Sequence, residues 1–384
     1  MKIATHSLCI NSPFPVKQYG FIDQTEEITE VHDDLHARIV AIDDGEGIHI
    51  HVSCDLIGLP YQFQESLYNR LKNETNRLLS LTIGTTHIHF GPTPHNEKYL
   101  SFLQDALFNQ INSLEYIGYS NLKVSYHCEQ FEGVGKSRIS NHKANVLLQL
   151  LTIYNEGKPL VVFMIHNCHP TIMAGSTPYF SSEYPGLSIE KLSHIFPDTF
   201  FTFIQGAAGD VSTRFTRETQ TYDAVESLAS CFVNEVSRLL SKKADKIKLD
   251  EICYKAEKLS FTHDTKPLVF DVPSDLSERE LVTIEVGKVM RQRLLSKPEN
   301  LVKEVTISCL SFNQFKIVFA PNEMFSYYID AIDTTDTALA CYSNGYSPYV
   351  TAIDNQVITY EKFTDTLTKE TKESLYSTIH RISR

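Results

Sequence analysis

The stretch NVLLQLLTIYNEGKPLVVFMIHNCHPTIMAG, residues 145–175, holds two apolar runs separated by an Asn-Glu-Gly-Lys turn. Each run has the length and the β-branched content of a buried strand, and the turn residues favour a hairpin. The second run ends at His166 and His169, and Pro170 restricts the residue before it to extended backbone. Polar groups at strand ends commonly build sites in α/β proteins. This hairpin therefore predicts a buried sheet with a possible site at its end.

Segments with strand-like and helix-like patterns alternate along the rest of the chain. Strands are expected at 35–44, 47–59, 78–92, 121–133, 199–212, 302–312 and 314–321, and helices at 63–79, 101–114, 187–196, 223–243, 282–295, 321–332 and 364–382. Hairpins occur together with longer crossovers, so the sequence predicts an α/β fold with mixed sheets. No stretch rich in Pro, Gly or Ser divides the chain, and we expect residues 1–384 to form one domain.

The composition is that of a soluble globular protein with an ample core, because 42% of residues are hydrophobic and 21% are charged. Lys and Arg total 35 against 47 Asp and Glu, which gives a formal net charge of −12. An acidic chain repels phosphate backbones and anionic headgroups, which argues against nucleic acid as a partner.

The N-terminus and the cysteines both favour a cytoplasmic location. Polar residues interrupt the first 20 positions, so no signal peptide is seen, and no segment reaches the ~18 apolar residues of a membrane span. The eight cysteines form no CxxC pair and most lie in apolar runs. We expect buried, reduced thiols rather than disulfides or a thiolate metal site.

Two histidines near residue 90 form the first candidate site. His87 and His89 stand two apart in TTHIHFGP, so in an extended strand both imidazoles would project from one face. That spacing suits one metal ligand and one neighbour that binds substrate or moves a proton, although a half-exposed strand explains it equally well. His49 and His51 have the same spacing, but no Gly-Pro loop follows them, and we interpret that pair as structural.

Further polar groups follow other buried strands. Asp210 and Ser212 lie in the small-residue segment QGAAGDVS, where a tight turn is the simpler explanation for Asp210. Glu323, in APNE, is expected in the first turn of a helix, where a carboxylate is favoured by the helix dipole whatever its function. Tyr342, Tyr346, Tyr349 and Tyr360 follow, and interior aromatic residues are the default explanation for them.

Two histidines and one carboxylate are a common catalytic zinc set, because they leave a coordination position for water. Zinc lowers the pKa of bound water to about 7 and polarises a carbonyl oxygen. Such a site is consistent with His87, His169 and Glu323. Sequence separation alone leaves open whether the three groups converge.

The order of short motifs resembles the neutral, non-lysosomal ceramidase family, specifically its N-terminal catalytic domain. The motifs are VHDDLHARIVAIDDG, VSCDLIGLP, THIHFGP, HPTIMAG with SSEYPG, QGAAGDVS, APNE and SNGYSPYVT, and together they run through most of the chain. The resemblance implies two central mixed β-sheets flanked by helices, an α-β-β-α sandwich. It also leads us to expect one catalytic domain without the C-terminal β-sandwich domain of ceramidases.

The resemblance further implies a set of site residues. One zinc ion would be held by His87, His169, Glu323 and Tyr349. The groups implied beside the metal are His89, Arg138 in GKSRIS, Asp210, Ser212 and Tyr360. Arg138 and Tyr360 would stabilise a developing oxyanion, and His89 or Ser212 would pass a proton to the leaving amine.

The hypothesis from sequence is a zinc-dependent amidohydrolase that uses metal-activated water to cleave an N-acyl, ceramide-like amide, with a role in sphingolipid metabolism. One alternative keeps the metal site and assigns it a small non-lipid amide or an ester. A second is a binding protein that kept the fold without catalysis, and a third is a serine hydrolase built on Ser212. Manganese or iron would also suit these ligands.

Overall fold

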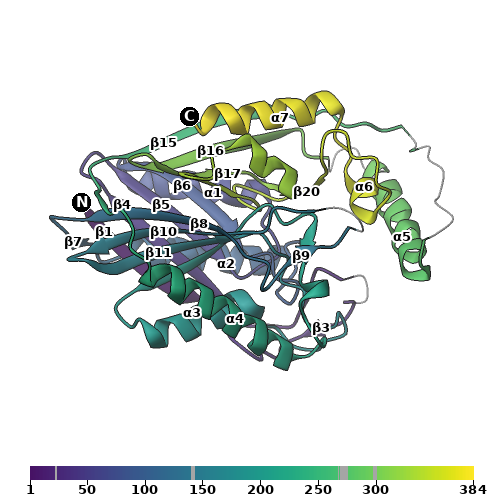
Figure 1. Cartoon of the computed structure of the whole chain (residues 1–384), viewed down its shortest axis with the longest axis horizontal. Helices are drawn as coiled ribbons and strands as arrows, with labels where there is room; N and C mark the ends of the chain where they lie inside the picture. The colour runs from purple at the N-terminus through teal and green to yellow at the C-terminus, as the bar shows by residue number, and fades with distance from the viewer. Residues whose placement is uncertain (22–23, 140–142, 267, 269–275, 297–300) are drawn as a thin grey trace.

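A five-stranded mixed sheet is built from the first third of the chain in the computed structural model, which describes residues 1–21, 24–139, 143–266, 268, 276–296 and 301–384 (Figure 1). Its order is β6-β5-β4-β1-β7, with β1 (Lys2–Cys9), β4 (His36–Asp43), β5 (Ile48–Cys54), β6 (Leu78–Thr85) and β7 (Ile117–Gly118). Strands β4 and β5 form the expected hairpin. Helix α1 (Tyr61–Glu74) crosses over to make β6 parallel to β5. Helices α1 and α2 (Glu97–Asn112) bury their leucines on one face of this sheet.

The 145–175 stretch lies at the centre of a second five-stranded sheet. Its order is β12-β11-β10-β8-β14, with β8 (Lys123–Gln130), β10 (Leu147–Asn155), β11 (Lys158–His166), β12 (Phe200–Gln205) and β14 (Ile247–Lys248). The predicted β10–β11 hairpin is confirmed, and β12 joins β11 in parallel. Helices α3 (Glu183–Ile195) and α4 (Tyr222–Ser241) cover the outer face, along the lower edge of Figure 1.

The inner faces of the two sheets share one apolar core. Val40 and Ile42 of β4 pack in the same cluster as Phe163 and Ile165 of β11. Fully burying a side chain of this size contributes about 1.5–3 kcal/mol, which favours the face-to-face arrangement. The predicted α/β fold with two central mixed sheets flanked by helices is confirmed.

A third sheet, which the sequence did not predict as a separate layer, extends this core. Its order is β15-β16-β17-β19, with β15 (Ile252–Ser260), β16 (Glu304–Phe312), β17 (Phe315–Phe319) and β19 (Thr337–Ala340). Phe312 and Phe319 enter the core of the first two sheets. Helix α7 (Lys369–Ile382) covers the opposite face with Leu375 and Ile379. The expected C-terminal surface helix is therefore half buried.

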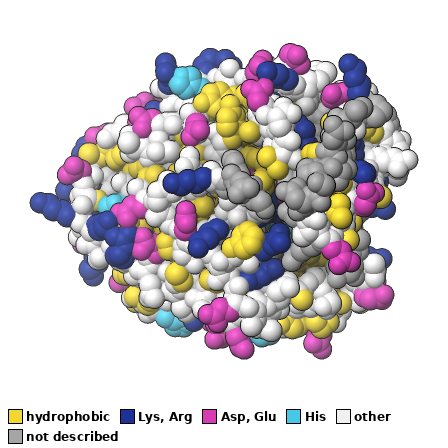
Figure 2. Space-filling model, turned by 45° about the vertical axis from the view of Figure 1, so that its right-hand side comes forward, with side chains coloured by type: hydrophobic (Ala, Val, Ile, Leu, Met, Phe, Trp, Pro, Cys, Tyr) yellow, Lys and Arg dark blue, Asp and Glu magenta, His cyan; other side chains and the backbone are white. Residues whose placement is uncertain are grey.

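The remaining elements are the 18-residue helix α5 (Glu278–Leu295) and several short ones. The short ones are β2 (Val16–Lys17), β3 (Glu27–Ile28), β9 (Lys136–Ser137), β13 (Val211–Ser212), β18 (Asn322–Met324), β20 (Ser347–Val350), the 3-10 turns η1 (Thr213–Phe215) and η3 (Ser326–Ala331), and α6 (Tyr360–Thr364). On the face shown in Figure 2, acidic and basic side chains are interspersed. The net charge is therefore not gathered into one patch on this face.

Two predicted elements differ from the structure. The strand from Leu78 ends at Thr85, so His87 lies in a loop, where its φ is 61° and its N–H donates to the carbonyl of Leu56. The helix predicted over 321–332 is a short strand, β18, followed by η3. The main chain of β18 pairs in parallel with β20, and this tertiary pairing overrides the local helical pattern.

The segment that follows β19 joins all three sheets. The N–H of Cys341 donates to the backbone carbonyl of Gln205 at the end of β12, at 2.8 Å. The N–H of Thr85 at the end of β6 donates to the backbone carbonyl of Tyr342, at 3.1 Å. The N–H of Asn344 donates to Ile83, at 2.8 Å. The ends of strands from three sheets are thereby held in one place.

None of the described helices is both long enough and apolar enough to span a membrane. The structure pairs none of the eight cysteines in a disulfide. Four of them, Cys54, Cys168, Cys309 and Cys341, are buried, whereas Cys9 is exposed.

Two buried histidines away from the candidate site predict a loss of stability in acid. Burial lowers the pKa of His51 to about 3 and of His166 to about 4, from an ordinary value of 6.5. The unfolded chain therefore binds these protons at a higher pH than the folded chain does. The free energy of unfolding should fall as the pH decreases from about 6.5 to 4, by about 1.4 kcal/mol per pH unit for each group.

Urea unfolding between pH 4.5 and 7 tests this prediction. His166→Asn should reduce the slope of the unfolding free energy against pH by the contribution of about one proton. The control His194→Asn, at an exposed position, should leave that slope unchanged. Equal slopes for both variants and the wild type would contradict the assignment.

Candidate metal site

The side chains of His87, His169 and Glu323 meet where the three sheets join. Glu323 Oε2 lies 3.4 Å from His87 Nε2 and 3.2 Å from His169 Nε2. The hydroxyl of Tyr349 lies 3.3 Å from His169 Nε2. His87 and His169 are each 1% exposed and Glu323 is 4% exposed, so the group is shielded from water. The four residues predicted as one set are neighbours in space.

Each of these residues comes from a different strand end. His87 follows β6, and His169 follows β11, where its N–H donates to the carbonyl of Val211. Glu323 on β18 is paired in register with Tyr349 on β20. The β18–β20 pairing thus brings a carboxylate and a phenol to the two imidazoles.

Backbone carbonyls fix the orientation of both imidazole rings. Nδ1 of His87 lies 2.7 Å from the carbonyl oxygen of Ile57, and Nδ1 of His169 lies 2.7 Å from that of Ala208. A carbonyl only accepts, so each Nδ1 is the donor. Both Nε2 atoms are therefore the ring nitrogens that face the Glu323 carboxylate.

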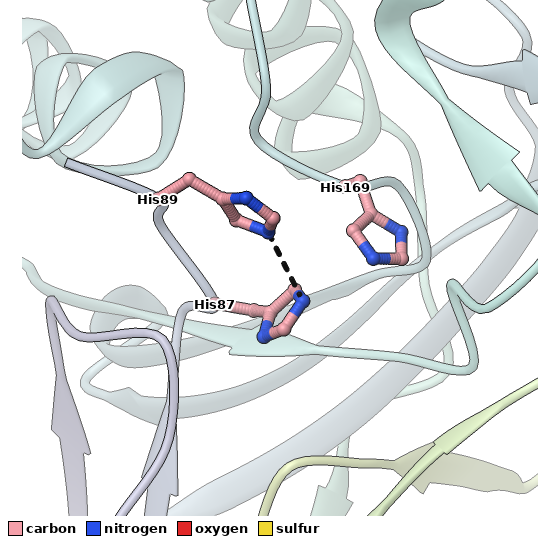
Figure 3. A group of neighbouring side chains, drawn as sticks. All are labelled: His87, His89 and His169. Carbon is pink, nitrogen blue, oxygen red and sulfur yellow. Dashed lines mark hydrogen bonds between the residues drawn. The ribbon is translucent and has the colours of Figure 1, made fainter. Parts of the chain in front are cut away.

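His89 belongs to the same cluster, as Figure 3 shows. Its Nε2 lies 3.4 Å from that of His87, and ligand atoms of His87, His89 and His169 all lie within 4.8 Å of one another. Burial, followed by the nearby His87 and His169, holds the pKa of His89 well below its usual value. The two histidines were expected on one face of a strand, but the loop turn after β6 brings them together.

The carboxylate of Glu323 is charged although it is buried. Burial alone would raise its pKa, but His87 and His169 outweigh that effect and hold the pKa well below its usual value. The hydroxyl of Tyr346 donates a hydrogen bond to Oε1, which leaves Oε2 directed at the imidazoles. The sequence had suggested only an interior aromatic residue at position 346.

Arg138 lies against Tyr349. Its Nη2 donates to the Tyr349 hydroxyl at 2.9 Å and to the Gly209 carbonyl at 2.6 Å, and lies 2.9 Å from Glu361 Oε1. Burial would lower the pKa of Arg138, but Glu361 and Tyr349 raise it above the usual value, so the guanidinium is cationic. Sequence reasoning identified Arg138 and missed Glu361, which directly follows the predicted Tyr360.

Tyr360 also lies beside this group, with its ring centroid 5.9 Å from that of Tyr349 at nearly a right angle. Asp210 accepts hydrogen bonds from the N–H and hydroxyl of Ser326, at 2.6 and 2.8 Å. Ser212 pairs in a β-bridge with His169, and its hydroxyl accepts from the N–H of Arg214 at the start of η1. Asp210 and Ser212 thus stabilise the backbone next to the cluster, Asp210 through Ser326 and Ser212 through His169.

Aromatic packing and two glycines hold the cluster's rings. The ring of Tyr342 lies 4.0 Å from the ring of His87, centroid to centroid. A methyl group at Gly20 would fall 2.5 Å from the His89 ring, and one at Gly58 would fall 2.4 Å from the Tyr346 ring. Only a residue without a side chain fits at these two positions.

The donor atoms include a group that could hold a metal ion: His87, His89 and His169 place ligand atoms within 4.8 Å of one another. The Glu323 carboxylate lies beside His87 and His169, and the Tyr349 hydroxyl lies beside His169. Nitrogen and oxygen ligands of this kind suit zinc, and also manganese or iron. His89 adds a third imidazole, so more than one ligand set is available.

The fold resembles that of solved neutral ceramidases. One structure is described as "Ceramidase complexed with C2" and another as a neutral ceramidase from Pseudomonas aeruginosa. Each matches with a TM-score of 0.77 and 14% identity, over 100% of this chain and 74% of the other. No protein-family model and no curated sequence matches. The chain therefore has a neutral ceramidase-like fold, as the motifs had indicated.

The close contact at Gly58 predicts that Gly58→Ala is destabilising. The added methyl must displace the Tyr346 ring, and overpacking of this kind costs about 1–3 kcal/mol. Urea unfolding should show this loss, whereas Gly118→Ala should be near neutral because its methyl meets nothing within 4 Å. Equal stability of both variants would refute the contact.

Proposed function

We propose that this protein is a metal-dependent hydrolase that cleaves an N-acyl amide, with one zinc ion held by His87, His169, Glu323 and Tyr349. The observation that carries the proposal is the approach of Glu323 Oε2 to both imidazole Nε2 atoms. A buried carboxylate between two oriented imidazoles is the arrangement expected of ligands that share a cation. The neutral ceramidase-like fold supports the choice of an amide.

A divalent metal held by these groups would polarise a carbonyl oxygen and lower the pKa of a bound water. The protein's own contribution begins with the orientation of the ligands. The carbonyls of Ile57 and Ala208 fix the two imidazoles, and the Tyr346 hydroxyl fixes the carboxylate. A preorganised set of this kind requires no rearrangement during the reaction.

Proton transfer is assigned to His89 in this proposal. Its lowered pKa keeps the ring neutral near pH 7, so the imidazole would be able to accept a proton from the attacking water and return it to the leaving amine. Arg138 and Tyr360 would donate hydrogen bonds to the carbonyl oxygen as negative charge develops there. Ser212, whose hydroxyl accepts from a backbone N–H of η1, has a supporting role.

The substrate class is proposed to be a lipid-like N-acyl amide of the ceramide kind. The "Ceramidase complexed with C2" structure has the same fold over the whole of this chain, which supports this choice. A small polar amide or an ester is the alternative for the same site. The acyl chain and the leaving amine therefore need separate tests.

Removing a ligand should have a different effect from removing the proton carrier. His169→Ala should lose bound zinc and turnover together, because it deletes one donor of the cluster. His89→Ala should keep stoichiometric zinc but lower kcat by about 10²–10⁴-fold, the usual contribution of a general acid–base. Elemental analysis and single-substrate kinetics on purified protein measure both effects.

If His169→Ala retains full zinc and activity, the ligand assignment is wrong. If chelation leaves activity intact and a serine-directed reagent abolishes it, a serine hydrolase built on Ser212 replaces the metal mechanism. A wild-type chain that takes up no zinc, manganese or iron would favour a binding protein.

A panel of matched amides and esters tests the substrate. N-acyl sphingosines and acyl p-nitroanilides of increasing chain length are compared with p-nitrophenyl esters of the same acids. We expect kcat/KM to rise with acyl length and to be highest for the lipid amide. Preference for acetyl or other short polar groups would remove the lipid proposal and leave the metal site standing.

A further inference from the structure

We infer that Glu361 is a positioning residue that acts through Arg138 to hold the Tyr349 hydroxyl beside His169. This inference rests on the proposed function, in which Tyr349 is a metal ligand. The path is short: Glu361 Oε1 forms an ion pair with Arg138 Nη2 at 2.9 Å, and the same nitrogen donates a hydrogen bond to the Tyr349 oxygen at 2.9 Å. Three side chains thus form one continuous link to the cluster.

Tyr349 depends on this link more than the other donors of the cluster do. A backbone carbonyl orients each of His87 and His169, and a hydroxyl orients Glu323. The hydrogen bonds described for the Tyr349 hydroxyl are those to Arg138 and to His169 itself. Arg138 is therefore the group that orients the Tyr349 oxygen toward the imidazole.

Arg138 in turn requires a counter-charge. Its Nη2 also donates to the Gly209 carbonyl, but a neutral carbonyl does not balance a guanidinium that is largely buried. Glu361 is the carboxylate that forms an ion pair with Arg138, and it is 7% exposed. Removing one partner leaves the other charge buried and unpaired.

Helix α6 gives Glu361 a fixed position. Thr359 caps the helix by accepting from the N–H of Lys362, and Phe363 is buried. The helix also packs against α5, as Figure 1 shows. One rigid turn therefore supplies both Tyr360, placed beside the reacting group, and Glu361, placed behind Arg138.

The test measures the affinity of the apo-protein for Zn²⁺ by competition with a chromophoric chelator. Glu361→Gln should weaken binding about tenfold, within the range found when a partner of a metal ligand is lost. Tyr349→Phe should weaken it at least as much. The double variant should bind no more weakly than Tyr349→Phe alone, because Glu361 acts through Tyr349. Thermal unfolding confirms that the variants are folded.

The matched control is Glu257→Gln, which removes an exposed carboxylate paired with Arg381 on the surface. It should leave the affinity unchanged. If Glu361→Gln behaves like this control while His169→Ala loses zinc, the inference about Glu361 is overturned and the proposed function stands. If the double variant loses as much Zn²⁺ affinity as the two single variants together, the inference is also overturned. Glu361 would then act on the site through its charge and not through Tyr349. A wild-type chain with no affinity for Zn²⁺ overturns the proposed function and the inference together.

Discussion

The carboxylate of Glu323, buried between two imidazoles, is the constraint on which the site depends. An ionised carboxylate has a high free-energy cost in a dry interior unless other groups satisfy it. Here the Tyr346 hydroxyl satisfies one oxygen, and His87 and His169 face the other. The backbone carbonyls behind those imidazoles fix which nitrogen faces inward. These contacts together hold one negative charge in a defined direction.

The sequence predicted the layers of the fold better than the elements that carry the site. Apolar runs and turn residues located the β10–β11 hairpin and the helices, because burial and turn chemistry are local signals. The segment after Pro321 was predicted as a helix, yet β18 forms because a strand from elsewhere in the chain pairs with it. The strand predicted through His89 ends at Thr85, where the chain meets Tyr342 of a different sheet. Both errors fall where long-range pairing decides the backbone.

The site residues show the same limit. The order of motifs brought His87, His169, Glu323 and Tyr349 into one hypothesis. The structure places Glu323 within 3.4 Å of both imidazoles and the Tyr349 hydroxyl 3.3 Å from His169. Spacing alone gave no reason to place Tyr346 or Glu361 in the site. The sequence around a tyrosine or a glutamate does not indicate which distant residue its side chain will contact. Their roles come from contacts with residues distant in the chain. Tyr346 bonds to Glu323, 23 positions earlier, and Glu361 pairs with Arg138, more than 200 positions earlier.

The segment from Cys341 to Asn344, which joins the three sheets, lies near the end of the chain. His169 and Glu323 are separated by 154 positions and Tyr349 and His169 by 180, so loop-closure entropy opposes their meeting until the sheets exist. During synthesis, the strands of the two five-stranded sheets leave the ribosome before the segment that joins all three sheets. His87 and His169 therefore lack their carboxylate until the last third of the chain has docked. The cluster is completed only when most of the chain is in place.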